Sequence, residues 1–277
     1  MVFLLILRIL TALIGIPVII LAIWLGKTSF AIVVSILVVI GALEFSDFVK
    51  KKGIVHGRGK VVATAFAFPL LAFFNLFETV IPFALTILIL YNLLLRLFSG
   101  KVKDSILYTS VGLLIPLYTG FLPSHLILIR DMEGAMGLYF SLITFMIAWS
   151  NDTAAYFVGT NFGKRKLCPS VSPKKTFEGA FGGLIGVIVV IFIMDFIMMN
   201  QFGITVSFSK WHLFFISIIA SLAATFGDLV ESMLKRDANL KDSGNIIPGH
   251  GGVLDRFDSV FFVAPIVYYY IKFLVGL

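Results

Sequence analysis

The chain has 277 residues, of which 59% are hydrophobic and only 13% are charged, whereas about 25% of the residues of an average protein are charged. This composition excludes a water-soluble domain, and it excludes a disordered chain because apolar residues dominate throughout. Cys168 is the single cysteine, so an intramolecular disulfide is excluded as well. The sequence therefore predicts a protein that crosses a membrane several times.

Nine apolar segments are predicted to be membrane-spanning helices, because each approaches the roughly 20 residues that cross the hydrocarbon core. Their continuous apolar runs favour helices over a barrel, in which lipid-facing and lumen-facing residues alternate. In chain order the segments are 3–25, 28–48, 61–77, 79–98, 105–124, 136–158, 177–199, 211–235 and 259–276. The predicted fold class is an all-α polytopic membrane protein with about nine transmembrane helices.

Lys and Arg residues accumulate on alternate connections between these segments, as they do on the cytoplasmic side of membrane proteins. Most of the 22 lie within 50–60, 96–103, 164–175 and 235–256. This pattern predicts a cytoplasmic N-terminus and a C-terminus on the outside. It also accounts for the net charge of +7, so no nucleic-acid partner is expected. Glu44 and Asp47, near the inner end of the second span, are expected to pair with the basic segment 50–60.

No internal repeat is present and no connection is long enough to fold separately, so residues 1–277 are predicted to form one integral-membrane domain. Within it, residues 1–135 contribute the N-terminal spans. Residues 136–277 contribute the spans and the cytoplasmic loops expected to carry the active site. The first span is expected to be retained, because no small-residue cleavage site precedes Lys27.

Two predicted cytoplasmic stretches, 149–183 and 228–258, hold far more polar residues than a connection needs. The first places Asn151 and Asp152 within an apolar span and continues into Ser172-Pro173-Lys174-Lys175-Thr176. The second contains Asp228, Glu231, Asp255 and Asp258, with the run Gly249-His250-Gly251-Gly252. The chemistry of this protein is expected to lie between the two stretches.

The carboxylates of the second stretch need a positive partner. Asp228 lies about seven residues inside a span, where an ionised side chain is costly without one. Glu231 follows at i+3, on the same helix face, and Asp255 and Asp258 have the same spacing. Either Lys and Arg residues neutralise these acids or a divalent cation binds between them, and the sequence leaves both explanations open.

A site that combines a metal ion with phosphates is the favoured interpretation of this second stretch. Mg²⁺ binds through one or two carboxylates and completes its coordination with water and substrate phosphates, and glycines let a backbone approach a ligand closely. A solute pathway would instead place ionisable residues near the middle of the bilayer, whereas these acids cluster near one surface. His250 is open as a general acid, a phosphate donor or a loop residue.

The second stretch resembles the signature of a known family. Its segments are Ser232-Met233-Leu234-Lys235-Arg236, then Lys241-Asp242-Ser243-Gly244, then Pro248-Gly249-His250-Gly251-Gly252-Val253-Leu254-Asp255-Arg256-Phe257-Asp258. They match, without departure, the signature of phosphatidate cytidylyltransferase, or CDP-diacylglycerol synthase. The segment Ser172–Thr176 followed by Glu178-Gly179 is also similar to that family, and the short N-terminus resembles its bacterial form.

The resemblance implies an enzyme that converts CTP and phosphatidate (phosphatidic acid) to CDP-diacylglycerol and pyrophosphate, with Mg²⁺ as cofactor and a second cation left open. By the same resemblance the protein is expected to be a homodimer. It is expected in the inner membrane, with its active site on the cytoplasmic side where CTP is found. No enzyme nucleophile is required, because an oxygen of phosphatidate attacks CTP directly.

Roles for individual residues follow from this implied reaction. The catalytic candidates are Asp228, Asp255, Asp258, His250 and Lys241. The metal-ligand candidates are Asp228, Asp255, Asp258 and, more weakly, Glu231. The substrate-binding candidates are Ser172, Lys174, Lys175, Thr176, Glu178, Lys235, Arg236, Gly251, Gly252 and Arg256.

Three other functions compete with this reading. A transporter of an anionic solute would also have many spans and inward-facing basic residues, and it predicts uptake into sealed vesicles without covalent turnover. A CDP-alcohol phosphotransferase would unite lipid, CDP and metal, but its Asp-Gly-x-x-Ala-Arg pattern is absent from the sequence. A purely structural membrane protein would not explain the carboxylates around Gly249-His250-Gly251-Gly252.

Overall fold

The computed structural model describes residues 2–54, 56–204, 209–244, 246 and 251–275, with only the backbone described for 2–10 and Ala12. The helices are α1 (Val2–Leu25), α2 (Lys27–Lys51), α3 (Arg58–Phe73), α4 (Phe77–Phe98), α5 (Ser105–Pro116), α6 (Leu122–Arg130), α7 (Ala135–Phe162), α8 (Phe177–Phe202), α9 (Lys210–Asp237) and α10 (Leu254–Tyr270). Two π-helical turns, η1 (Leu117–Phe121) and η2 (Ile271–Val275), and two strands, β1 (Lys166–Cys168) and β2 (Ser172–Thr176), accompany them.

In the described part of the chain the helices join into nine rods, because η1 links α5 to α6 without a break and α10 continues into η2. Six rods are long and apolar enough to cross a membrane: Lys27–Lys51, Phe77–Phe98, Ser105–Arg130, Phe177–Phe202, Lys210–Asp237 and Leu254–Val275. The helical class is therefore confirmed. The count of nine membrane spans stays a prediction, since α3, for example, has 16 residues against the roughly 20 that a span needs.

Several boundaries differ from the predicted segments, and two of them have a clear physical reason or bear on the site. The break between the third and fourth rods falls at 74–76 rather than after residue 77, because Asn75 adopts a positive φ of 59° and ends the helix there. The last rod begins at Leu254 rather than at residue 259. Asp255 and Asp258 therefore lie on α10 itself.

The hairpin of β1 and β2 is a departure from the all-α prediction. The strands pair antiparallel, with Lys166 opposite Thr176 and Cys168 opposite Ser172. They contain three and five residues, which is too short a run for an alternating polar and apolar pattern to predict a strand.

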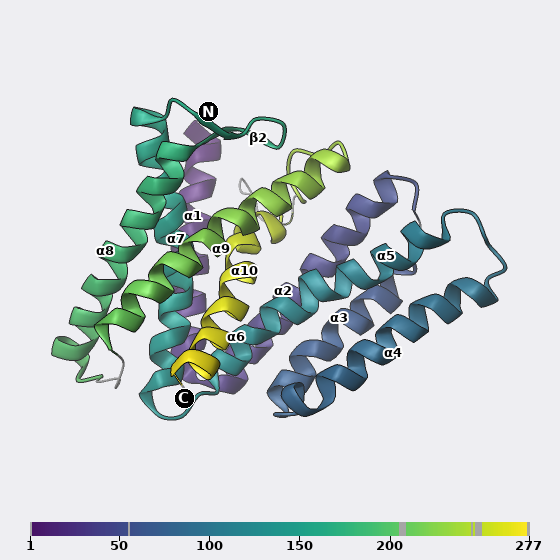
Figure 1. Ribbon diagram of the computed structural model, residues 1–277, viewed down its shortest axis with the longest axis horizontal. Coiled ribbons are helices and arrows are strands. Elements are labelled where there is room, and N and C mark those ends of the chain that lie inside the picture. The colour runs from purple at the N-terminus through teal and green to yellow at the C-terminus, as the bar shows by residue number, and fades with distance from the viewer. Residues whose placement is uncertain (1, 55, 205–208, 245, 247–250, 276–277) are drawn as a thin grey trace.

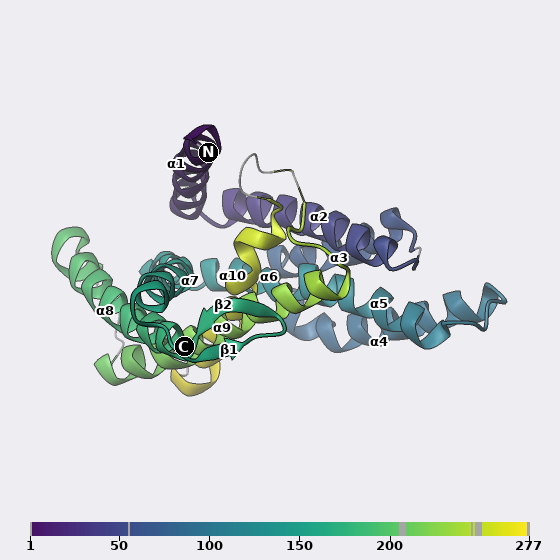
Figure 2. The same ribbon diagram turned by 90° about the horizontal axis from the view of Figure 1, so that it is seen from above.

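The rods form a wide bundle with α9, α10 and α6 in the middle. Figures 1 and 2 both show α7 and α8 on one side of these central helices and α4 and α5 on the other. The closest packing is between α7 and α8, where a Cβ atom at Gly182 would lie 2.5 Å from the Val158 Cβ. Added Cβ atoms at Gly179, Gly183 and Gly186 would also lie within 3 Å of atoms of α7, so small residues on α8 allow the two helices to approach closely.

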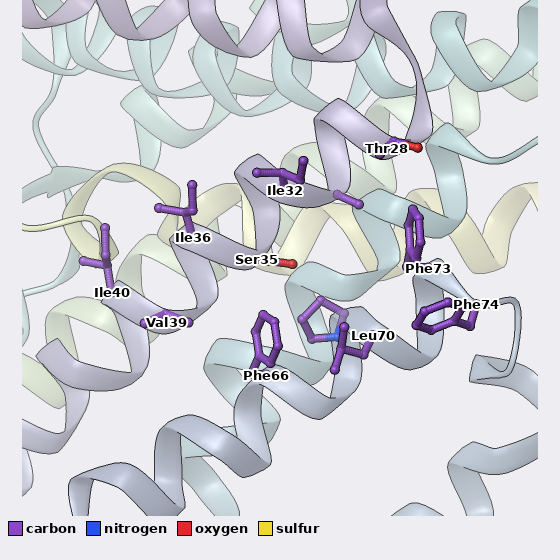
Figure 3. Close-up of a pocket in the computed structure, with 12 residues that line it drawn as sticks. Thr28, Ile32, Ser35, Ile36, Val39, Ile40, Phe66, Leu70, Phe73 and Phe74 are labelled. Atoms are coloured by element: carbon purple, nitrogen blue, oxygen red, sulfur yellow. The ribbon is translucent and has the colours of Figure 1, made fainter.

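The outer surface of the bundle is strongly apolar, with exposed side chains such as Phe98, Phe181 and Phe196. A groove of about 470 Å³ lies on this surface between α2 and α3. Figure 3 shows Ile36, Phe66 and Leu70 among the side chains that line it. Among the residues that the structure describes, no charged side chain lines this groove, and the polar stretches meet elsewhere.

Candidate active site

The hairpin is anchored at the junction of α7 and α8 through Thr176. The Thr176 hydroxyl accepts a hydrogen bond from the Gly179 N–H at 3.1 Å and so caps the N-terminus of α8. A Cβ atom at Gly163 would lie 2.6 Å from the Thr176 Oγ1. Because Gly163 has no side chain, the end of α7 and the start of α8 meet closely, and the hairpin is held over their junction.

Glu178 shapes the chain that enters the hairpin. Its Oε2 accepts hydrogen bonds from the backbone N–H groups of Lys164, at 3.0 Å, and Arg165, at 3.1 Å. As an acidic side chain in the first turn of α8 it also interacts favourably with the helix dipole. Glu178 was predicted to bind substrate, but its recorded bonds are to the protein backbone.

A pocket of about 290 Å³, lined by both polar and apolar side chains, lies between the hairpin, α7, α8 and α9. Its lining includes Asn151, Asp152, Gly159, Lys174, Lys175, Thr176, Gly179, Thr225 and Asp228. Lys174, Lys175 and Thr176 come from the first polar stretch, and Asp228 comes from the second. The two stretches that the sequence singles out therefore meet in this pocket.

Two carboxylates face the pocket from neighbouring helices. Asp228 on α9 forms an ion pair with Lys175 on β2 and accepts a hydrogen bond from the Ser232 hydroxyl at 3.3 Å. Asp152 on α7 accepts a long hydrogen bond from the Ser259 hydroxyl at 3.5 Å. Asp152 was not among the predicted site residues, although a carboxylate within an apolar span is itself a signal of function.

Asn151 fixes how α7 and α9 face each other beside this pair. The Ser221 hydroxyl donates to the Asn151 Oδ1 at 2.7 Å, and the Asn151 Nδ2 donates to the Thr225 Oγ1 at 3.3 Å. Asn151 is only 2% exposed, so these bonds form away from water, where they contribute most to orientation. They hold Asp152 and Asp228 on facing surfaces of the two helices.

Asp258 lies deeper, on α10, with 7% of its surface exposed. It accepts a hydrogen bond from the Ser259 N–H at 2.6 Å. The carboxylates of Asp228, Asp152 and Glu231 all act on it electrostatically. In the part of the chain that the structure describes, no basic side chain forms an ion pair with Asp258.

Tyr118 approaches this acidic group from the π-helical turn η1. Its side chain is buried among Phe45, Phe261 and Phe262, and among the described residues its hydroxyl has no hydrogen-bond partner. The charge of Asp258 acts on that hydroxyl. Tyr118 was not among the predicted site residues, because a π-helical turn, which is frequent at functional sites, has no sequence signature.

Lys235 forms ion pairs with the other two acids. Its ammonium lies 2.6 Å from the Glu231 Oε2 and 2.5 Å from the Asp255 Oδ1. All three side chains are nearly buried, with 12% of Lys235, 1% of Glu231 and 4% of Asp255 exposed. Lys235 is thus a positive partner of both Glu231 and Asp255, and their binding of a cation stays a prediction.

Asp255 is also bonded to the loop that precedes α10. Its Oδ2 accepts hydrogen bonds from the Ser243 N–H at 2.7 Å, the Ser243 hydroxyl at 2.8 Å and the Gly252 N–H at 2.8 Å. A Cβ atom at Gly251, where φ is +87°, would lie 2.5 Å from the same oxygen. Gly251 and Gly252, predicted to bind substrate, allow the backbone to wrap around this carboxylate.

The other predicted residues lie around these groups. Arg236 donates to the Leu240 carbonyl at 2.9 Å, at the end of α9, and Arg256 lies exposed in the first turn of α10. Lys241 is exposed in the loop after α9, and Ser172 begins β2. His250 lies outside the described residues.

Two carboxylates, Asp152 and Asp228, and two lysines, Lys174 and Lys175, line the pocket. Asp152, Asp228 and Asp258 influence one another, and Lys175 is the ion-pair partner of Asp228. The described residues contain no group of three or more His, Cys, Asp or Glu side chains arranged to hold a metal ion. This arrangement fits Mg²⁺, which uses one or two carboxylates and takes its other ligands from water and phosphates.

The comparisons with known proteins agree with the signature. Residues 6–274 match the Cytidylyltransferase family. The phosphatidate cytidylyltransferase of Bacillus subtilis (strain 168) is 36% identical over 265 residues, which cover 95% of this chain and 96% of that protein. Those of Staphylococcus haemolyticus and Staphylococcus saprophyticus are 47% and 48% identical over 131 and 132 residues, which cover 47% of this chain and 48% of each relative. The resemblance that the signature indicates is confirmed, and the chain belongs to the cytidylyltransferase family.

Proposed function

We propose that this protein is a CTP:phosphatidate cytidylyltransferase, which transfers CMP from CTP to phosphatidate and releases pyrophosphate. The observation that carries the proposal is the pocket in which Lys174 and Lys175 lie with Asp152 and Asp228. Lysines bind phosphates as point charges, and carboxylates bind the divalent cation that accompanies a triphosphate. Similarity to the Bacillus subtilis enzyme over 95% of the chain supports the same reaction.

In this reaction a phosphate oxygen of phosphatidate attacks the α-phosphorus of CTP, and the bond to pyrophosphate breaks as the new P–O bond forms. Catalysis then consists mainly of positioning the two phosphates and neutralising their charge. Lys174 and Lys175 hold phosphate oxygens, and the triphosphate takes Lys175 away from Asp228. The protein does not need to supply a nucleophile.

Asp228, Asp152 and Asp258 are the residues we propose to hold Mg²⁺, of which a bound ion uses one or two. When bound, the ion stabilises the charge that develops on the attacking and leaving oxygens. Direct binding of Mg²⁺ by Glu231 and Asp255 stays a prediction, because Lys235 contacts both of these carboxylates. A second cation also stays a proposal.

The proposed topology places the N-terminus and the pocket on the cytoplasmic side of the inner (cytoplasmic) membrane, with nine spans and the C-terminal end outside. Figure 1 supports it, because the hairpin and the first turns of α1 lie at one end of the bundle while η2 lies at the other. The basic connections support the same sidedness. The homodimer rests on the family resemblance.

The decisive experiment measures turnover by the purified protein in detergent. Radiolabelled CTP is supplied with phosphatidate, with and without Mg²⁺, and the lipid phase is extracted and counted. Label that enters the lipid only when both phosphatidate and Mg²⁺ are present is the expected result. Folded protein that transfers no label to lipid, but accumulates an anionic solute in sealed vesicles, would replace the proposed function with transport.

A further inference from the structure

Glu44 on α2 reaches the loop that leads into α10. Its Oε1 accepts a hydrogen bond from the Val253 N–H at 2.9 Å, and its Oε2 accepts one from the Leu254 N–H at 2.9 Å. The side chain is only 4% exposed. Glu44 and Asp47 were predicted to pair with the basic segment that follows. Asp47 does pair with Arg58, but Glu44 contacts the start of α10 instead.

These contacts make Glu44 a cap for another helix. Leu254 is the first residue of α10, and the first N–H groups of a helix have no partner within the helix. A carboxylate at that position satisfies them and also interacts favourably with the positive end of the helix dipole. Among the described residues, the N-cap residue Val253 has no side-chain capping bond of its own, and the Ser243 hydroxyl accepts a hydrogen bond from the next N–H of the turn, that of Asp255, at 3.3 Å.

Ser243 connects Glu44 to Asp255. The Ser243 hydroxyl lies 3.2 Å from the Glu44 Oε2 and 2.8 Å from the Asp255 Oδ2. A hydroxyl has one hydrogen to donate, so the two carboxylates share a single donor. The orientation of Asp255 therefore depends on the same serine that contacts Glu44.

The glycines of the loop fit around the Glu44 carboxylate. A Cβ atom at Gly252 would lie 2.5 Å from the Glu44 Oε1, and one at Gly244 would lie 2.7 Å from the same oxygen. On α2, a Cβ atom at Gly41 would lie 3.1 Å from the Leu254 side chain. Three glycines thus leave space for this carboxylate and for the contact of α2 with the start of α10.

We infer that Glu44 is a positioning residue for the active site, which fixes Ser243, Val253 and the first turn of α10 and thereby sets the position of Asp255 and Asp258. The inference rests on the proposed function for its effect on turnover, whereas its effect on the loop is independent of that function. No substrate needs to contact Glu44. Its carboxylate acts through Val253, Leu254 and Ser243.

The test compares Glu44→Gln with Asp47→Asn, a matched control that removes a carboxylate from the same end of α2 where the side chain is 50% exposed. An amide has one acceptor oxygen, and an NH₂ donor takes the place of the other carboxylate oxygen. Glu44→Gln therefore leaves one of the two backbone N–H groups, of Val253 or Leu254, facing a donor, with little change in side-chain size. Hydrogen–deuterium exchange of a peptide spanning residues 252–258 reports on the loop. Turnover with CTP, phosphatidate and Mg²⁺ reports on the site.

We expect Glu44→Gln to speed exchange in this peptide by about tenfold or more, because lost hydrogen bonds lower local stability, and to lower kcat by a similar factor. Asp47→Asn should leave both at wild-type values. The inference would be overturned if Glu44→Gln kept wild-type exchange in this peptide, whether or not it lost turnover. Equal effects of Glu44→Gln and Asp47→Asn would overturn it as well. If Glu44→Gln does not fold, hydrogen–deuterium exchange of the wild-type protein provides the test. Fast exchange of the Val253 and Leu254 amides would rule out the cap. Inactive wild-type protein with a protected peptide would instead refute the proposed function alone.

Discussion

Lys175 and Asp228 form an ion pair that joins strand β2 to helix α9 in the pocket between the hairpin, α7, α8 and α9. The two side chains are 25% and 28% exposed, so solvent and ligands have access to both. A phosphate competes for the lysine and a cation competes for the carboxylate. In the proposed reaction we therefore expect a substrate phosphate to take the place of Asp228 beside Lys175, and a cation to take the place of Lys175 beside Asp228.

Asp228→Asn should remove most of the activity with little loss of stability. The amide keeps the shape of the side chain but has no charge for a cation, and we expect kcat to fall by about 100-fold or more. Turnover and thermal unfolding of the purified protein in detergent measure the two effects. The control is Asp237→Asn on the same helix, whose side chain is 62% exposed and pairs with Lys52; comparable losses in both variants would contradict a specific role for Asp228.

Lys235→Met should act mainly on stability. It leaves Glu231 and Asp255 buried without their shared cation, and breaking a buried ion pair costs about 3–5 kcal/mol of unfolding free energy. A clear drop in the midpoint of thermal unfolding is the expected result. Lys52→Met is the matched control, because the Lys52–Asp237 pair is 42% and 62% exposed and surface pairs contribute about 0–1 kcal/mol. If the two variants unfold at the same temperature, Lys235 does not stabilise the acids as described.

Gly227→Ala tests the close approach of α9 and α10. A Cβ atom at Gly227 would lie 2.7 Å from the Asp258 carbonyl oxygen and 3.1 Å from the Phe262 Cβ, so the helices must separate. We expect a loss of about 1–3 kcal/mol in unfolding free energy, together with reduced turnover because Asp258 moves. Gly15→Ala is the control, since a Cβ atom there would have nothing within 4 Å; a Gly227→Ala protein as active and stable as Gly15→Ala would contradict the packing.

Chelation separates a catalytic cation from a structural one. We expect EDTA to abolish turnover, because the proposed reaction depends on Mg²⁺. The unfolding temperature should stay nearly unchanged, because among the described residues no three metal-binding side chains form a preformed site. Added Mg²⁺ should restore turnover, and the Asp228→Asn variant should need more Mg²⁺ to do so. Activity that persists in EDTA, or a protein that unfolds on chelation, would argue against this assignment.

The sequence by itself determined the class of protein and the segments that carry chemistry. Long apolar runs predict helices in a membrane because a bilayer core offers the backbone no hydrogen bonds. The acids and glycines of 228–258 identified the second polar stretch, and their order carried the family resemblance. These properties depend on composition and local spacing, which are readable along the chain.

Only the tertiary structure decided which charges pair and which stay available. Lys235 and Lys175 are equally basic in sequence, yet one is enclosed by Glu231 and Asp255 while the other faces the pocket. Glu44 contacts residues more than 190 positions away, a separation at which local patterns carry no information. Charge balance and helix capping depend on distances between helices, and those distances are set by packing of the whole bundle.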